Sequence, residues 1–234
     1  MTKIAIFVEG PTELKFAKKL IWQRYGHLTP KVSEIVCRGK DRYISPPEPQ
    51  ASSGLHWFIL LIEVPNRDTV VSYIMDNATN MVSRRNFNLL LGLRDLLPDK
   101  RSDKIRVINA TNATLKRSPV CDKIRVVLAV METEAWFLCD WHMFQKIDTR
   151  LTTAFIQGHL GLDLVNDDPE VAYDHPARIL DDIVRLVKRR YRKHRLEIDT
   201  VVRNLDVGYL CSSTSKIASF FRFITELDSC APES

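Results

Sequence analysis

The fold is decided by residues 4–16, which read IAIFVEGPTELKF. The opening apolar run, rich in β-branched residues, is typical of a short strand buried in a parallel sheet. Gly10 and Pro11 then force a tight turn, and apolar residues at helical spacing predict a helix that runs to about Arg24. The chain therefore opens with a strand, a turn and a helix. Glu9 stands at the carboxyl end of the strand, where open α/β sheets place their binding sites.

Further apolar segments extend this pattern along the chain. The order of strands and helices implies right-handed crossovers, and we expect an α/β fold with a mostly parallel central sheet, flanking helices and additional C-terminal helices. The strands are expected at residues 57–63 (WFILLIE), 87–93 (FNLLLGL), 105–108 (IRVI) and 124–130 (IRVVLAV), and helices at 67–81 and 212–227. Residues 30–36 fit a short strand or an irregular segment, and the Pro-rich residues 38–54 are expected to form a mobile loop.

The composition is that of an ordinary globular protein, since 45% of the 234 residues are apolar and 27% are charged. The longest apolar run, residues 57–62, is too short to span a bilayer, and the N-terminus lacks the apolar region of a signal peptide. The five cysteines form no CxxC pair and the six histidines no HExxH motif. We therefore expect a cytoplasmic protein with reduced thiols, without a structural zinc site and without a membrane partner.

Acidic residues follow three of the predicted strands. Glu9 follows the first strand, Asp95 follows the third, and Glu132 and Glu134 follow the last. Glu9 would lie beside Glu13 at this edge, where a carboxylate is costly unless a positive charge shares it, so we expect a divalent cation such as Mg²⁺ or Mn²⁺ there. Hydrogen bonds from turns or from helix N-termini are the alternative explanation for each acid.

Three motifs resemble those of a known family. Residues 9–16, in the pattern strand-Glu-Gly-x-Thr-Glu-x-x-Phe, look like the opening motif of Toprim domains, in the form found in OLD-family nucleases and related small prokaryotic proteins. Residues 132–140, ETEAWFLCD, resemble a motif of Toprim-like proteins that prokaryotes encode beside ATPases. With LRD at residues 93–95, the resemblance extends over residues 4–145.

The resemblance implies a metal-dependent site. In Toprim domains the first Glu, here Glu9, is a metal-site or general acid/base residue, and the third strand ends in Asp-x-Asp. Here Asp95 is present, but Leu97 occupies the second acidic position. Glu63, at the end of the second strand, is a rival for Asp95, although no second acid follows it either. Glu134, with Glu132 behind it, is expected to replace or supplement the missing acid. The predicted catalytic residues are Glu9, Glu13, Asp95 and Glu134, and the predicted metal ligands are Glu9, Asp95, Glu132 and Glu134.

The function implied by the resemblance is a Mg²⁺-dependent nuclease-like phosphodiester hydrolase acting on DNA or RNA, as an effector of defence against phage or plasmids with a possible partner ATPase. Leu97 keeps an alternative open, a degenerate Toprim subunit that binds nucleic acid or the ATPase without cutting. A Toprim-like core is expected over residues 1–145, with a helical extension over 146–234 packed on it. Assembly into a homo-oligomer stays open.

The positive charge of the chain is concentrated in residues 185–195, RLVKRRYRKHR, which hold seven cations and no acid, so that the rest of the chain sums to 5 − 7 = −2. A capped amphipathic helix is expected from His175 to about Tyr191, with the basic run at its end. Such a run would bind the phosphates of nucleic acid without reading bases, or would form a solvated helix face. The predicted nucleic-acid-binding residues are Arg185, Lys188, Arg189, Arg190, Arg192, Lys193 and Arg195.

Overall fold

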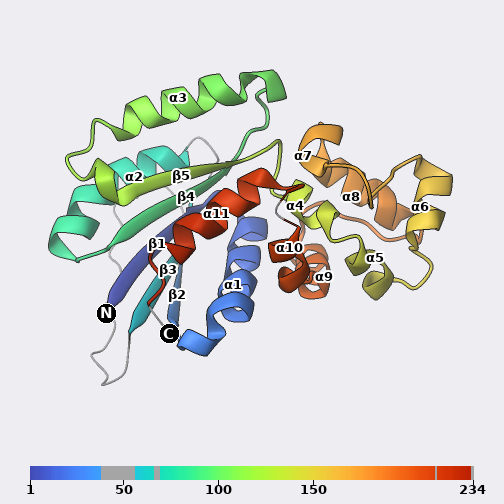
Figure 1. Ribbon diagram of the computed structural model, residues 1–234, viewed down its shortest axis with the longest axis horizontal. Helices are drawn as coiled ribbons and strands as arrows, with labels where there is room; N and C mark the ends of the chain where they lie inside the picture. The colour runs from blue at the N-terminus through green and yellow to red at the C-terminus, as the bar shows by residue number, and fades with distance from the viewer. Residues whose placement is uncertain (38–55, 66–68, 214, 233–234) are drawn as a thin grey trace.

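The protein has a mixed α/β fold built on a five-stranded sheet in which every neighbouring pair of strands is parallel (Figure 1). The computed structural model describes residues 1–37, 56–65, 69–213 and 215–232. The strands are β1 (Thr2–Val8), β2 (Lys31–Val36), β3 (Trp57–Glu63), β4 (Leu89–Asp95) and β5 (Ile124–Ala129). They lie in the order β2-β3-β1-β4-β5, which confirms the predicted α/β fold with a parallel central sheet.

β1 lies at the centre of the sheet and aligns the strand ends at which the candidate site is built. Val8, its last residue, pairs with Glu63 of β3 and with Leu93 of β4. Asp95 ends β4 and pairs with Ala129 of β5. The carboxyl ends of these strands therefore meet at one edge, and the segments that follow β1, β4 and β5 approach one another there.

Helices cover both faces of the sheet and its carboxyl edge (Figure 1). Alternate residues of β1 face opposite sides. Ile4 and Ile6 pack with α1 and the C-terminal helices, whereas Ala5 and Phe7 pack with α2. The helices are α1 (Pro11–Tyr25), α2 (Thr69–Thr79), α3 (Lys104–Leu115), α4 (Glu134–Cys139), α5 (His142–Ile147), α6 (Thr153–Leu160), α7 (Pro169–Ala172), α8 (Pro176–Arg185), α9 (Arg195–Asn204), α10 (Val207–Ser212) and α11 (Ala218–Asp228). Short 3-10 helices span Gly26–Leu28, Arg101–Asp103 and Cys121–Lys123, and a π-helix spans Asn80–Arg84. None of the helices in the described ranges is long and apolar enough to cross a membrane.

Aromatic packing joins the sheet to the C-terminal helices. The ring centroid of Trp136 on α4 lies 5.8 Å from that of Phe16 on α1 and 5.2 Å from that of Phe220 on α11. These three side chains are fully buried in one hydrophobic cluster that contains residues from both sides of position 145. Since α4 also carries Glu134, this packing holds one of the candidate site residues in place.

The strand predicted at residues 105–108 is wrong, because these residues lie in α3. Val107 and Leu115 are buried on one side of this helix, whereas Ile105 is 65% exposed. A four-residue apolar run fits either structure, and here the segment packs against β5 as a helix. Residues 31–36, left open above, form β2, and the loop expected at residues 38–54 lies outside the described residues.

Two predicted C-terminal helices are also wrong in extent. The helix expected to reach Tyr191 ends at Arg185, and a segment of turns and bends, residues 186–194, joins α8 to α9. In this segment Lys188 and Lys193 have φ values of 62° and 58°, in the left-handed region, which no α-helix contains. The helix expected over 212–227 begins only at Ala218, as α11, and Ser212 is the last residue of α10.

Candidate metal centre

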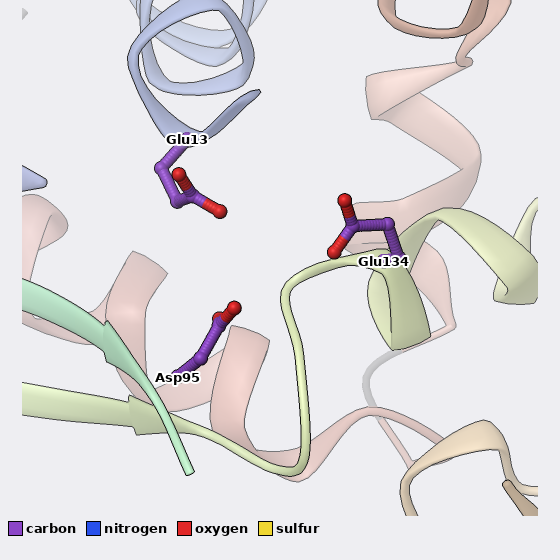
Figure 2. A group of neighbouring side chains, drawn as sticks. All are labelled: Glu13, Asp95 and Glu134. Atoms are coloured by element: carbon purple, nitrogen blue, oxygen red, sulfur yellow. The ribbon is translucent and has the colours of Figure 1, made fainter. Parts of the chain in front are cut away.

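Three buried carboxylates converge at the carboxyl edge of the sheet (Figure 2). Glu13 lies in the first turn of α1, Asp95 at the end of β4, and Glu134 at the start of α4. One carboxylate oxygen from each residue lies within 4.8 Å of those of the other two. The residues are only 3%, 5% and 0% exposed, so the three acids share a site that is largely shielded from water.

The turn after β1 determines which acid is buried. Gly10 is extended, with φ −168° and ψ −179°, and Pro11 starts α1 directly after it. This brings Glu13 into the site while Glu9 remains half-buried at its margin, where its Oε2 accepts a hydrogen bond from the Asp95 backbone N at 3.3 Å. A Cβ at position 10 would lie 3.1 Å from Oε2 of Glu13, so a glycine there leaves room for the buried carboxylate.

Asp95 is held by the segment that follows β5. Its Oδ1 accepts hydrogen bonds from the backbone N and the hydroxyl of Thr133, both at 2.9 Å. Thr133 is therefore not a side-chain cap of α4, although it precedes that helix. Leu97, in the second acidic position of the resemblance, packs against a small apolar cluster that includes Val107 and Met131, and contributes no carboxylate to the site.

Glu132 and Glu134 are tied to the segment between α8 and α9. Glu134 accepts a hydrogen bond from the Tyr191 hydroxyl at 2.8 Å, and Glu132 accepts one from the Ala177 backbone N at 2.9 Å. Both acids also contact the ammonium of Lys193, at 3.2 Å from Glu132 Oε1 and 3.1 Å from Glu134 Oε1. Segments more than 40 residues apart in the sequence are thus joined through these two carboxylates.

The seven predicted nucleic-acid-binding cations fall into two groups. Lys193 points into the acidic site and is the only one of the seven paired with it. The other six are exposed, and two of them lie near acids of α8, with Arg185 at 3.7 Å from Asp182 and Arg190 at 3.8 Å from Asp181. These six cations are Arg185, Lys188, Arg189, Arg190, Arg192 and Arg195.

The electrostatics of the site indicate a shortage of positive charge. Burial and the nearby Glu134 carboxylate raise the pKa of Glu13 to about 8. Burial and the neighbouring acids likewise raise the pKa of Asp95 well above its usual value, and burial raises that of Glu134. Burial alone would lower the pKa of Lys193, but the surrounding carboxylates, with Glu134 foremost, raise it overall. One ammonium therefore does not balance these acids.

The donor set fits a hard divalent cation. Carboxylate oxygens are the ligands that Mg²⁺ and Mn²⁺ prefer, and three convergent carboxylates are enough to hold one such ion. Asp95 and Glu134 belong both to the metal ligands predicted from the sequence and to the buried cluster of three carboxylates. Glu13, predicted above as catalytic only, is the third member of the cluster, while Glu9 lies at its margin and Glu132 contacts Lys193.

Sequence reasoning missed two features near the site. The sequence predicts Tyr191 at the end of a helix, and its hydrogen bond to Glu134 depends on the fold. A groove of about 710 Å³ also lies between α1, α9 and the carboxyl ends of β2 and β3. Its charged lining residues are Lys15, Lys18, Lys19, Arg195 and Arg203, with Glu34, Glu63 and Asp199. No short motif reveals this groove, because its lysines are interspersed with the apolar residues of α1.

Comparison with known protein families gives a match that covers most of the chain. A family model described as "Domain of unknown function (DUF4276)" matches residues 8–228, a range that includes every acid of the site and the segment with Lys193. No significant match was found among curated proteins or among solved structures.

Proposed function

The chain belongs to the DUF4276 family of unknown function, and from the geometry of its site we propose that it is a Mg²⁺- or Mn²⁺-dependent phosphodiester hydrolase acting on nucleic acid. The observation that carries this proposal is the convergence of Glu13, Asp95 and Glu134, buried and within 4.8 Å of one another at the carboxyl ends of parallel strands. Burying several acids together is costly, and a cation that they share offsets this cost.

Each group of the site has a distinct task in this proposal. Glu13, Asp95 and Glu134 would hold the ion, which would polarise a phosphate oxygen and neutralise charge on it. Thr133 orients Asp95 through two hydrogen bonds, and so keeps one carboxylate oxygen in place. Glu9 is half-buried beside Asp95, so it is placed to take up a proton from an attacking water or to add a further ligand.

Nucleic acid is the proposed substrate because exposed cations lie near the acidic site. The basic segment 185–195 adjoins it through Lys193, and Arg195 belongs both to that segment and to the groove beside α1. A phosphate backbone following these surfaces would bind mainly by charge, which makes affinity fall steeply with salt. The absence of a recognisable base-reading motif is consistent with binding to DNA or RNA irrespective of sequence.

The resemblance to Toprim domains supports the same proposal from another direction. From this resemblance we also propose that the protein is a cytoplasmic effector of defence against phage or plasmids and is coupled to a partner ATPase. Neither addition affects the chemistry at Glu13, Asp95 and Glu134.

A second function is favoured by a specific observation. Leu97 packs into an apolar cluster where the resemblance places a second acid, and Lys193 supplies a cation that the site would otherwise need. A subunit that binds nucleic acid or a partner protein without cleaving would have these features. Metal binding distinguishes the two proposals, since only the first requires it.

The decisive experiment is a calorimetric titration of wild type and Asp95→Asn with Mn²⁺, followed by cleavage assays on single- and double-stranded DNA and RNA. Asn retains an oxygen that can accept the two bonds from Thr133, so the variant should fold. We expect saturable binding by wild type, weakened at least about tenfold by Asp95→Asn, and metal-dependent cleavage by wild type alone. Asp122→Asn, at an exposed residue paired with Lys123, serves as the control. No binding by wild type, with or without nucleic acid, would refute the hydrolase proposal and favour the second function.

A further inference from the structure

The ammonium of Lys193 contacts Glu134, one of the three carboxylates of the acidic site. We propose that Lys193 is a built-in counter-ion of this site, and that a divalent metal ion binds by displacing its ammonium from Glu134. This inference rests on the proposed function, because it assumes that the acidic site takes a metal ion. It adds that the chain sets its own metal affinity and that metal binding moves the segment between α8 and α9.

The ammonium of Lys193 contacts the same carboxylate that a metal ion would bind. Its Nζ lies 3.1 Å from Oε1 and 3.2 Å from Oε2 of Glu134, so it contacts both oxygens of a carboxylate that would hold the ion. It also lies 3.2 Å from Oε1 of Glu132. A Mg²⁺ ion binds carboxylate oxygens at about 2.1 Å. An ammonium and a dication on the same carboxylate would be only a few ångströms apart, where their repulsion is strong.

The exposure of these side chains shows which of them is free to leave. The side chain of Glu134 is fully buried, whereas 38% of the Lys193 side chain is exposed. The Glu134 carboxylate is fixed by α4 and by the Tyr191 hydroxyl, whereas the Lys193 side chain reaches it from a partly exposed segment. A metal ion arriving at the carboxylates can therefore expel the lysine into water without unpacking the core.

The backbone around Lys193 is under constraint. Its φ of 58° is in the left-handed region, which side chains other than glycine rarely adopt. The ammonium contacts with Glu132 and Glu134 tie this part of the segment to the acidic site. Losing them would allow residues 186–194 to relax, although Tyr191 would still be fastened through its backbone N to Asp181 at 2.7 Å.

Lys188 provides a matched control within the same segment. It is a lysine with nearly the same φ, 62°, but its side chain is exposed, and the ion pairs found between a lysine and Glu132 or Glu134 in the described part of the chain come from Lys193. Substituting either lysine by Met removes one positive charge from the segment and leaves a side chain of similar length. Only the change at Lys193 removes the proposed competitor.

The test is calorimetric titration of the full chain with Mn²⁺, without nucleic acid, at about pH 8.5, where protons compete less for Glu13. We expect Lys193→Met to bind Mn²⁺ at least about tenfold more tightly than wild type, equivalent to about 1.4 kcal/mol, and Lys188→Met to match wild type within about twofold. Equal or weaker binding by Lys193→Met would overturn the inference while leaving a metal site in wild type. Absence of binding by both proteins would overturn the inference and the proposed function together.

A second measurement tests the same displacement in wild type, so it does not depend on whether a variant folds. Hydrogen exchange of wild type, followed by mass spectrometry, compares residues 186–194 without and with saturating Mg²⁺. We expect faster exchange of these amides with Mg²⁺, because the segment loses its link to Glu132 and Glu134. Unchanged or slower exchange in a protein that binds Mg²⁺ would show that Lys193 stays in place, and would refute displacement.

Discussion

Replacing Glu13 by Gln should stabilise the metal-free protein, and increasingly so as the pH rises. Glu13 is buried with Asp95 and Glu134, and its pKa is raised from 4.5 to about 8. Between these two values the folded chain holds a proton on Glu13 that the unfolded chain does not. Folding stability contributed by this proton is complete below pH 4.5 and is lost as the pH rises to about 8. Gln has the shape of the protonated acid and cannot lose that proton.

The expected magnitude follows from the linkage of proton binding to folding. Each pH unit between 4.5 and 8 lowers the stability of wild type, relative to Glu13→Gln, by at most about 1.4 kcal/mol. From about pH 6 to pH 8 the advantage of the variant should therefore grow by up to about 3 kcal/mol. For a chain of this size that corresponds to a rise of about 6–12 °C in the difference between the two Tm values.

The assay is thermal or urea unfolding of both proteins in chelator across this pH range. Glu34→Gln, at a glutamate of β2 that pairs with Lys18 outside the acidic site, is the matched control. Saturating Mg²⁺ should offset most of the advantage that the variant gains over this pH range, because an ion present at about 100 times its Kd stabilises wild type by about 2.7 kcal/mol and Glu13→Gln lacks one ligand. A Glu13→Gln protein no more stable than wild type at pH 8, or an advantage that does not grow with pH, would refute the argument that Glu13 is buried among uncompensated acids.

Two further predictions concern activity and binding. Glu9→Gln should abolish metal-dependent cleavage without unfolding the protein, since Gln retains an oxygen that can accept the bond from the Asp95 backbone N; unchanged turnover would remove Glu9 from the mechanism. Changing the exposed Arg189, Arg190 and Arg192 together to Glu should weaken nucleic-acid binding and reduce the magnitude of its salt slope by about one for each lost cation. An unaltered salt slope, measured by fluorescence anisotropy from low to moderate salt, would mean that this part of the segment is a solvated surface.

The edge of the sheet at which the site lies was predictable, because it depends only on which residues directly follow parallel strands. Each parallel strand presents its carboxyl end to the same edge, so acids placed just after β1, β4 and β5 must come near one another. Asp95 and Glu134 are found together as expected. That Glu13, and not Glu9, is the third carboxylate of the buried cluster was not predictable in this way. It depends on where Pro11 starts α1 and on the space left by Gly10.

The structure of the basic segment, residues 185–195, could not be predicted from the sequence for a different reason. Apolar residues at helical spacing continue from Leu180 to Tyr191, and this local pattern predicts one unbroken helix. The helix ends at Arg185, and the following segment folds back so that Tyr191 and Lys193 reach Glu134. A pattern within one segment contains no information about a charged partner that lies 59 residues earlier in the chain.

The sequence by itself determined the class of fold, the central position of acids at strand ends and the concentration of positive charge in residues 185–195. These properties follow from local hydrophobic periodicity and from the geometry common to all parallel sheets. Only the tertiary structure decided that Glu13 joins Asp95 and Glu134, and that Lys193 is drawn out of the basic run to pair with them. The physical reason is that burial makes unpaired charge costly, so the pairing of these groups is set by which of them the fold removes from water together.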